Sequence, residues 1–134
     1  MKKIIFFALV CIVMLGCNKG SDDCTLNNSS ILGTYIMTGY TYQASTTSPV
    51  IDEFATYPAC AKDNVITFKA NSIYTFDEGV LTCPSSVTGA GTWRISGNTL
   101  TLDYESYTTT FNCKTLVIKT TGNTDIETAT LTKQ

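Results

Sequence analysis

The chain has 134 residues, carries a formal net charge of −2 at pH 7 and contains no histidine. A mildly acidic chain without a basic stripe is a poor candidate for binding nucleic acid. Without histidine it also lacks Ser-His and Cys-His nucleophile pairs and the usual general base near neutral pH. We therefore expect a protein that is not an enzyme, with no cofactor and no metal site.

The N-terminal segment has the pattern of a targeting signal. Lys2 and Lys3 precede an apolar run over residues 4–15. A run of about 12 residues is too short to cross a bilayer, which takes roughly 20, but suits the core of a signal peptide. It ends in Met14-Leu15-Gly16-Cys17, which resembles the bacterial lipobox, where the cysteine thiol takes a diacylglycerol. The pattern predicts a signal peptide over residues 1–16 and lipid attachment at Cys17, with a plain signal peptide as the alternative.

A polar stretch follows Cys17, and the first sustained apolar residues come at 31. We expect residues 17–30 to be the lipidated cysteine and a flexible tether, and residues 31–134 to be one domain. Ser21-Asp22-Asp23 resembles the acidic export signal of surface lipoproteins in Bacteroidetes, with a solvated leash as the alternative. The resemblance implies a lipid anchor in the cell envelope, at the outer membrane and displayed on the surface.

Four cysteines remain once Cys11 is assigned to the signal and Cys17 to the lipid. An even number in an oxidising compartment predicts disulfides, and four cysteines allow three pairings. Pairing Cys60 with Cys83 closes a loop of about 24 residues, worth roughly 3–4 kcal/mol in the chain-entropy model. Cys24 then pairs with Cys113 or stays free.

The domain is rich in Thr, Tyr, Phe, Val and Ile, which favour strands. Period-two alternation begins at residues 31–43, with Tyr35, Met37 and Gly39 on one face and Tyr40 on the other. A short helix or irregular crossing is expected within residues 49–60, and a loop over 79–91. The remaining strands are predicted at 64–70, 72–77, 92–96, 99–104, 107–112, 115–120 and 125–133.

Eight strands joined mostly by short turns predict an all-β fold, a small antiparallel up-and-down barrel closed without free edges. A two-sheet β-sandwich is the alternative, but its order needs longer crossing loops than most of these turns.

Several segments of the chain resemble the lipocalin-like domains found in lipoproteins of Bacteroidetes. These segments are Leu32-Gly33-Thr34-Tyr35, residues 60–64 leading into 66–71, Gly79 before Cys83, and residues 91–100. The first lipocalin G-x-W signature reads Gly33-Thr34-Tyr35 here, with Tyr in place of Trp, and Gly91-Thr92-Trp93 provides the second. The resemblance implies an eight-stranded barrel and a pocket for a small apolar or amphipathic molecule.

The barrel interior is the candidate functional site. An eight-stranded barrel is filled by side chains or holds one small ligand. We expect seven inward residues as core or ligand lining: Tyr35, Met37, Phe68, Phe76, Trp93, Leu102 and Phe111.

Two functions remain open. The first is a binding module for a small apolar ligand, which an apolar cavity above roughly 300 Å³ would support. The second is a surface interaction or inhibitor module with a packed core, which would use the loops at 44–60 and 78–91 against an unidentified protein partner. The acidic pairs Asp52-Glu53 and Asp77-Glu78 are interpreted as solvated loop acids.

Overall fold

The computed structural model describes residues 24–85, 88–120 and 124–134. The predicted signal peptide and the predicted lipid attachment site at Cys17 lie outside the described residues. The described elements, in chain order, are β1 (Gly33–Gln43), β2 (Ile51–Asp52), the 3-10 helix η1 (Phe54–Thr56), α1 (Ala59–Lys62), β3 (Val65–Phe68), β4 (Ile73–Asp77), β5 (Gly89–Ser96), β6 (Thr99–Leu102), β7 (Glu105–Phe111), β8 (Thr115–Thr120) and β9 (Ile126–Lys133).

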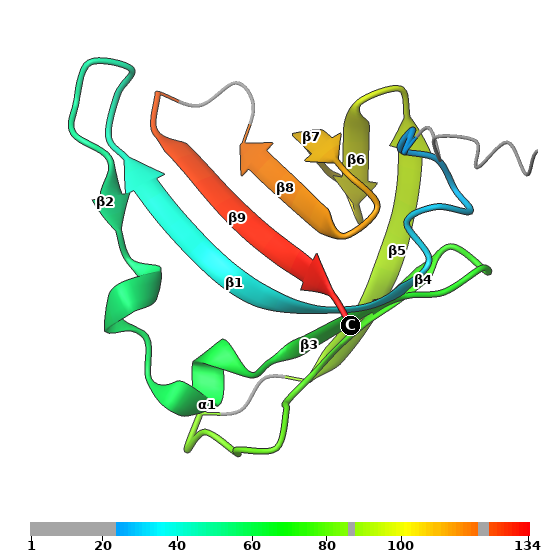
Figure 1. Ribbon diagram of the computed structural model, residues 1–134, viewed down its shortest axis with the longest axis horizontal. Coiled ribbons are helices and arrows are strands. Elements are labelled where there is room, and N and C mark those ends of the chain that lie inside the picture. Colours follow the sequence, from blue (N-terminus) through cyan, green and yellow to red (C-terminus); the bar gives the residue numbers. More distant parts are fainter. Residues whose placement is uncertain (1–23, 86–87, 121–123) are drawn as a thin grey trace, which may run out of the picture.

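The strands form one antiparallel sheet that closes on itself. Its order is β2-β1-β3-β4-β5-β6-β7-β8-β9, and β1 also pairs with β9. This last pairing joins the ends of the meander into an eight-stranded barrel, while the two residues of β2 pair only with the end of β1. Figure 1 shows β1 and β9 side by side along their lengths. The predicted barrel is confirmed, and the sandwich alternative is wrong.

A β-bulge in β1 changes which side chains face inward. The pairing with β9 shifts between Met37 and Gly39, so one extra residue lies on β1 at that point. A bulge reverses the alternation beyond it. Met37 and Tyr40 therefore both line the interior, and the predicted placement of Tyr40 on the opposite face is wrong.

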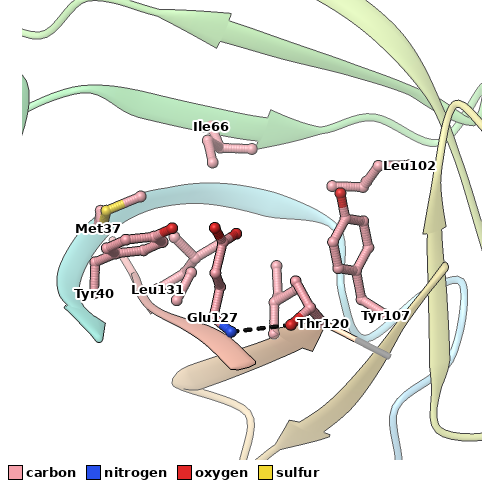
Figure 2. A pocket seen from close by; sticks show the side chains of 10 residues that line it. Met37, Tyr40, Ile66, Leu102, Tyr107, Thr120, Glu127 and Leu131 are labelled. Carbon is pink, nitrogen blue, oxygen red and sulfur yellow. Dashed lines mark hydrogen bonds between the residues drawn. The ribbon is translucent and has the colours of Figure 1, made fainter. Parts of the chain in front are cut away.

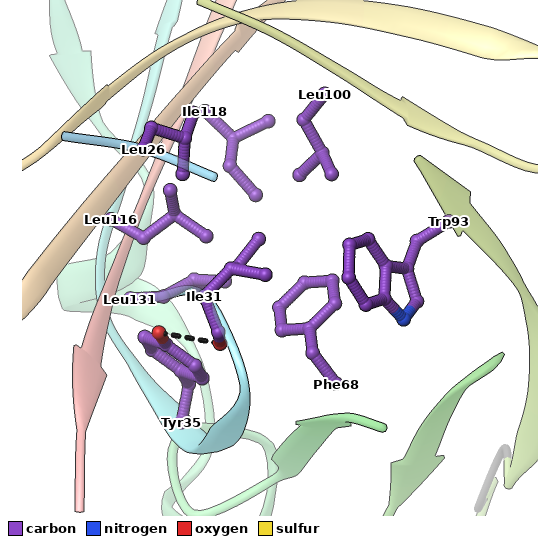
Figure 3. Close-up of a cluster of buried hydrophobic side chains, with 9 residues drawn as sticks. All are labelled: Leu26, Ile31, Tyr35, Phe68, Trp93, Leu100, Leu116, Ile118 and Leu131. Carbon is purple, nitrogen blue, oxygen red and sulfur yellow. Dashed lines mark hydrogen bonds between the residues drawn. The ribbon is translucent and has the colours of Figure 1, made fainter. Parts of the chain in front are cut away.

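One end of the barrel is closed by a packed core. Nine buried hydrophobic side chains form it, drawn in Figure 3: Leu26, Ile31, Tyr35, Phe68, Trp93, Leu100, Leu116, Ile118 and Leu131. The ring of Phe68 makes edge-to-face contacts with Tyr35 and Trp93, at centroid distances of 5.7 and 5.8 Å. The indole N–H of Trp93 donates to the carbonyl oxygens of Lys69 and Ile73.

The segment before β1 is part of this core. Leu26 and Ile31 are buried in the barrel end, and the Tyr35 hydroxyl donates to the Ile31 carbonyl oxygen at 2.8 Å. Cys24 forms a disulfide with Cys113 in the β7–β8 turn. We call residues 24–32 the plug. The predicted flexible tether therefore does not extend to residue 30, because burial of Leu26 and the disulfide hold residues 24–30 against the barrel.

The second disulfide lies at the opposite end. Cys60 in α1 is bonded to Cys83 in the β4–β5 loop. Figure 1 shows the plug (blue) at one end of the barrel, and β2, η1 and α1 at the other, where β1 ends. Each end of the barrel thus has its own covalent cross-link.

We predict that Tyr35→Phe lowers the free energy of unfolding by about 1–3 kcal/mol. The substitution leaves the Ile31 carbonyl oxygen buried without the donor it has now, and the cost of such an unsatisfied group falls in that range. Urea unfolding measures the change. Tyr104→Phe is the control, because the Tyr104 side chain is 99% exposed and its unfolding curve should match that of the unmodified protein.

Candidate functional site

The half of the barrel away from the plug contains an apolar pocket of about 220 Å³. Its lining side chains come from six strands, β1, β3, β6, β7, β8 and β9. Apolar groups dominate the lining: Met37, Ile66, Leu102, Ile118, Ala129 and Leu131. Ile118 and Leu131 also belong to the core, so these two side chains form the floor of the pocket where it meets the core.

Four polar side chains complete the lining: Tyr40, Tyr107, Thr120 and Glu127. Figure 2 shows the Glu127 carboxylate pointing into the pocket, with Tyr40 on one side and Tyr107 on the other. The Glu127 backbone N–H donates to the Thr120 hydroxyl at 2.9 Å. The pocket therefore combines an apolar floor with hydroxyl groups and one carboxylate.

The two tyrosines that line the pocket have raised pKa values. Burial raises the pKa of Tyr40 to about 12, and the negative charge of Glu127 and a hydrogen bond to it add to the effect. Burial also raises the pKa of Tyr107 to about 12, supported by a hydrogen bond from its hydroxyl to Glu105. These hydroxyls are thus neutral donors and acceptors over the physiological pH range.

Aromatic rings cover the pocket side of the β1–β3 connection. Tyr40 and Tyr57 stack at a centroid distance of 5.9 Å, and Phe54 lies 6.0 Å from Tyr57. The Lys62 ammonium lies 5.3 Å from the centre of the Phe54 ring and donates to the Ala55 carbonyl oxygen. The irregular segment expected within residues 49–60 thus packs its rings against Tyr40, which lines the pocket.

The mouth loops are fixed to each other by more than a disulfide. The backbone N–H of Leu81 donates to the Asp63 carboxylate at 2.8 Å. A methyl group at Gly79 would overlap the Asp63 backbone oxygen and carboxyl group, so the close approach of these two loops requires glycine there. Together with Cys60–Cys83, these contacts hold the entrance of the pocket in place.

The Asp103 side chain approaches the backbone of Gly91 closely, which accounts for glycine in the Gly91-Thr92-Trp93 segment. The Asp103 carboxylate accepts hydrogen bonds from the Tyr74 hydroxyl at 2.9 Å and the Thr92 backbone N–H at 2.8 Å. These bonds hold the pKa of Asp103 below its usual value, with the Thr92 N–H contributing most. A methyl group at Gly91 would overlap both Asp103 and the Tyr74 ring. The glycine makes room for a carboxylate, and the tryptophan two residues later packs in the core.

The seven interior residues predicted from sequence divide into four groups. Tyr35, Phe68 and Trp93 lie in the core, and Phe111 packs against it at the closed end. Met37 and Leu102 line the pocket. Phe76 is half-buried and pairs with Ile66 across β3 and β4, outside the described core cluster and the pocket lining.

The prediction missed the polar part of the lining. The inward position of Tyr40 was not predicted, because it depends on a bulge that the alternation of residue types does not indicate. Glu127 could have been found, because it lies four residues before buried Leu131 in β9 and so shares its face. The alternation of hydroxyl and apolar residues in β7 and β8 similarly places Tyr107 and Thr120 inward.

The described residues hold no group of three or more His, Cys, Asp or Glu side chains placed to bind a metal ion. Within the same part of the chain, no helix is both long and apolar enough to span a membrane.

The sequence model of the family described as "Lipocalin-like domain" matches residues 31–133. The chain therefore belongs to the lipocalin-like domain family, whose members are generally binding proteins without enzymatic activity. Searches of curated proteins and of solved structures each returned no match.

We predict that the folded protein loses stability as the pH rises from about 10 to about 12. Tyrosine in an unfolded chain has a pKa near 10, whereas Tyr35, Tyr40 and Tyr107 have pKa values of about 12 in the fold. The folded state retains protons that the unfolded state releases, so the stabilisation is complete below pH 10 and disappears as the pH approaches 12. Urea unfolding at stepped pH measures this loss. Tyr40→Phe should make the decline shallower; a decline unchanged by this substitution would contradict the assignment.

Proposed function

We propose that this protein is a membrane-anchored lipocalin-like lipoprotein that binds a small apolar ligand at the cell envelope. The main support for a ligand is that the barrel interior is divided into a packed half and a half with a pocket. The closed half is packed with side chains, whereas the other half leaves about 220 Å³ above an apolar floor. A protein that used the barrel only as a scaffold would gain stability by filling this space, since each buried methylene contributes roughly 0.8 kcal/mol.

The pocket volume sets the size of the ligand. It lies below the roughly 300 Å³ at which pockets for drug-sized molecules begin, so the cavity size expected from the sequence is not reached and only a smaller ligand fits. It exceeds the roughly 150 Å³ of an engineered cavity that binds benzene. Scaling from six carbon atoms in that cavity gives a ligand of about nine non-hydrogen atoms. The proposed ligand is accordingly a short alkyl or single-ring compound.

The membrane anchor is supported by the sequence before the barrel and by the cysteines within it. The lipobox-like Met14-Leu15-Gly16-Cys17 follows an apolar run of signal-peptide length. The four other cysteines of the mature chain are all in disulfides, which form in oxidising compartments such as the bacterial periplasm and cell surface. With the acidic Ser21-Asp22-Asp23, this favours the outer membrane and surface display.

The Cys24–Cys113 disulfide also sets an orientation for the anchored protein. Residues 18–23 separate Cys17 from Cys24, and a fully extended chain over this distance spans about 25 Å. Cys24 is bonded to Cys113 and lies two residues before Leu26, which is buried in the closed end of the barrel. A lipid on Cys17 would therefore hold the closed end toward the membrane and leave the pocket mouth facing away from it.

A second function, a surface interaction or inhibitor module, is supported by exposed apolar residues on the two mouth loops. Val50 and Ile51 lie in or next to β2, and Val80 and Leu81 lie in the β4–β5 loop. Exposed apolar groups on loops can form a contact surface for another protein. The unfilled pocket favours the ligand-binding function over this one.

We predict that the protein, carrying Cys17→Ala to avoid lipidation, binds 1-octanol. Burying about seven methylenes at roughly 0.8 kcal/mol each gives a dissociation constant on the order of 100 µM, measured by isothermal titration calorimetry. Ala129→Phe should abolish binding, because a phenyl ring fills most of the pocket. Thr108→Phe, an exposed position on β7, is the matched control and should bind octanol normally. Absence of binding to the parent protein would leave the interaction module as the better function.

We predict that Cys17→Ala moves the protein from the membrane fraction to the soluble fraction of its host. The substitution removes the thiol that would carry the acyl chains on which stable anchoring depends. Immunoblots of separated membrane and soluble fractions measure the change. Cys11→Ala is the matched control, since Cys11 lies inside the apolar run and should leave anchoring intact. Membrane retention of the Cys17→Ala protein would contradict the anchor.

A further inference from the structure

Glu127 is an unusual residue for the interior of a small barrel. It occupies the inward-facing row of β9, two residues from Ala129 and four from buried Leu131. Beside it in the pocket lie Tyr40 and Thr120, and the Thr120 hydroxyl accepts a hydrogen bond from the Glu127 backbone N–H. Among the described residues it forms no ion pair. Glu127 is half-buried, and a carboxylate partly withdrawn from water has a free-energy cost that a positive charge or hydrogen-bond donors reduce.

Among the described residues, no lysine or arginine side chain lines the pocket. Lys62 is engaged with Phe54 and the Ala55 carbonyl oxygen. Lys133 lies at the closed end, over the Tyr35 ring and bonded to the Ser30 carbonyl oxygen. The other cations are exposed: Lys69, Arg94, Lys114 and Lys119.

The groups around the pocket are negative instead. The negative charge of Glu53 acts on Tyr40 and that of Glu105 acts on Tyr107, in each case raising the pKa of a hydroxyl that lines the pocket. Asp103, bonded to Tyr74, directly follows the pocket residue Leu102 in the chain. Several carboxylates of one sign around an opening attract cations and repel anions.

The rings beside Glu127 add to the same preference. Tyr40 lines the pocket next to the carboxylate, and its ring stacks with that of Tyr57. The face of an aromatic ring attracts a cation by about 0.5–2 kcal/mol, more as the pair is desolvated. A positive group beside Glu127 would therefore meet a carboxylate and an aromatic face together.

We propose that the ligand is a small apolar amine of about nine non-hydrogen atoms, bound in its protonated form with the ammonium on Glu127 and the apolar part on the floor formed by Ile118 and Leu131. This inference rests on the proposed ligand-binding function and specifies the chemical class of its ligand. The ammonium replaces water at the Glu127 carboxylate, while the alkyl or aryl group fills the space above the core. An anionic ligand of the same length would place two negative charges together and be rejected.

Three compounds of nearly equal size separate the head group from the apolar part: n-octylamine, 1-octanol and octanoate. Titration calorimetry of the chain carrying Cys17→Ala should give the tightest binding for octylamine, about tenfold weaker binding for octanol, and the weakest for octanoate. Glu127→Gln should weaken octylamine binding about tenfold and leave octanol binding unchanged. Asp77→Asn removes a negative charge from the same end of the barrel on an exposed position of β4, and should change none of the three.

The outcomes distinguish the two levels of the proposal. Octanol binding together with octanoate binding as tight as that of octylamine, or octylamine binding unaffected by Glu127→Gln, would overturn the amine while the apolar pocket stands. Failure of all three compounds to bind would overturn both the proposed function and this inference. An equal loss of octylamine affinity in Asp77→Asn and Glu127→Gln would overturn the role of Glu127.

Discussion

The pairing of β1 with β9 turns a meandering sheet into a closed barrel, and both the core and the pocket depend on it. Along this seam Tyr35, Met37 and Tyr40 from β1 are brought beside Leu131 and Ala129 from β9. The bulge between Met37 and Gly39 lets one long strand serve both ends of the barrel. Tyr35 packs in the core, whereas Met37 just before the bulge and Tyr40 after it line the pocket. The same pairing therefore holds the packed core and the pocket in one sheet.

The barrel was predictable from sequence because alternating strands and short turns leave few other ways to bury one apolar face. Phe68, Trp93 and Tyr35 were placed correctly for the same reason. Tyr40 was not, since the bulge reverses which side chains face inward and nothing in the sequence marks the position of the extra residue. The packing of residues 24–30 was also missed, because their polar composition conceals the single buried anchor at Leu26 and only the disulfide reveals the tie.

The residues that carry the family resemblance are mainly structural, whereas the pocket's polar groups come from elsewhere in the chain. Gly79 and Gly91 allow close approaches, Trp93 packs in the core and Cys60–Cys83 joins the mouth loops. Tyr40, Tyr107 and Glu127 lie outside those segments. With the two sets of residues separate, the polar groups of the pocket can change in sequence while the residues that maintain the barrel stay the same. The match to the family therefore identifies the fold, whereas the chemistry of the pocket is set by this chain's own interior residues.

The Cys24–Cys113 disulfide has a mechanical consequence. A pulling force on the chain before the plug would enter the barrel through Cys24. The disulfide passes the load directly to the β7–β8 turn, bypassing Leu26 and Ile31, whose contacts in the plug are not covalent. Tension therefore does not peel the plug from the barrel end. Because the plug packs beneath the floor of the pocket, the shape of the pocket stays independent of tension on the chain that precedes the plug.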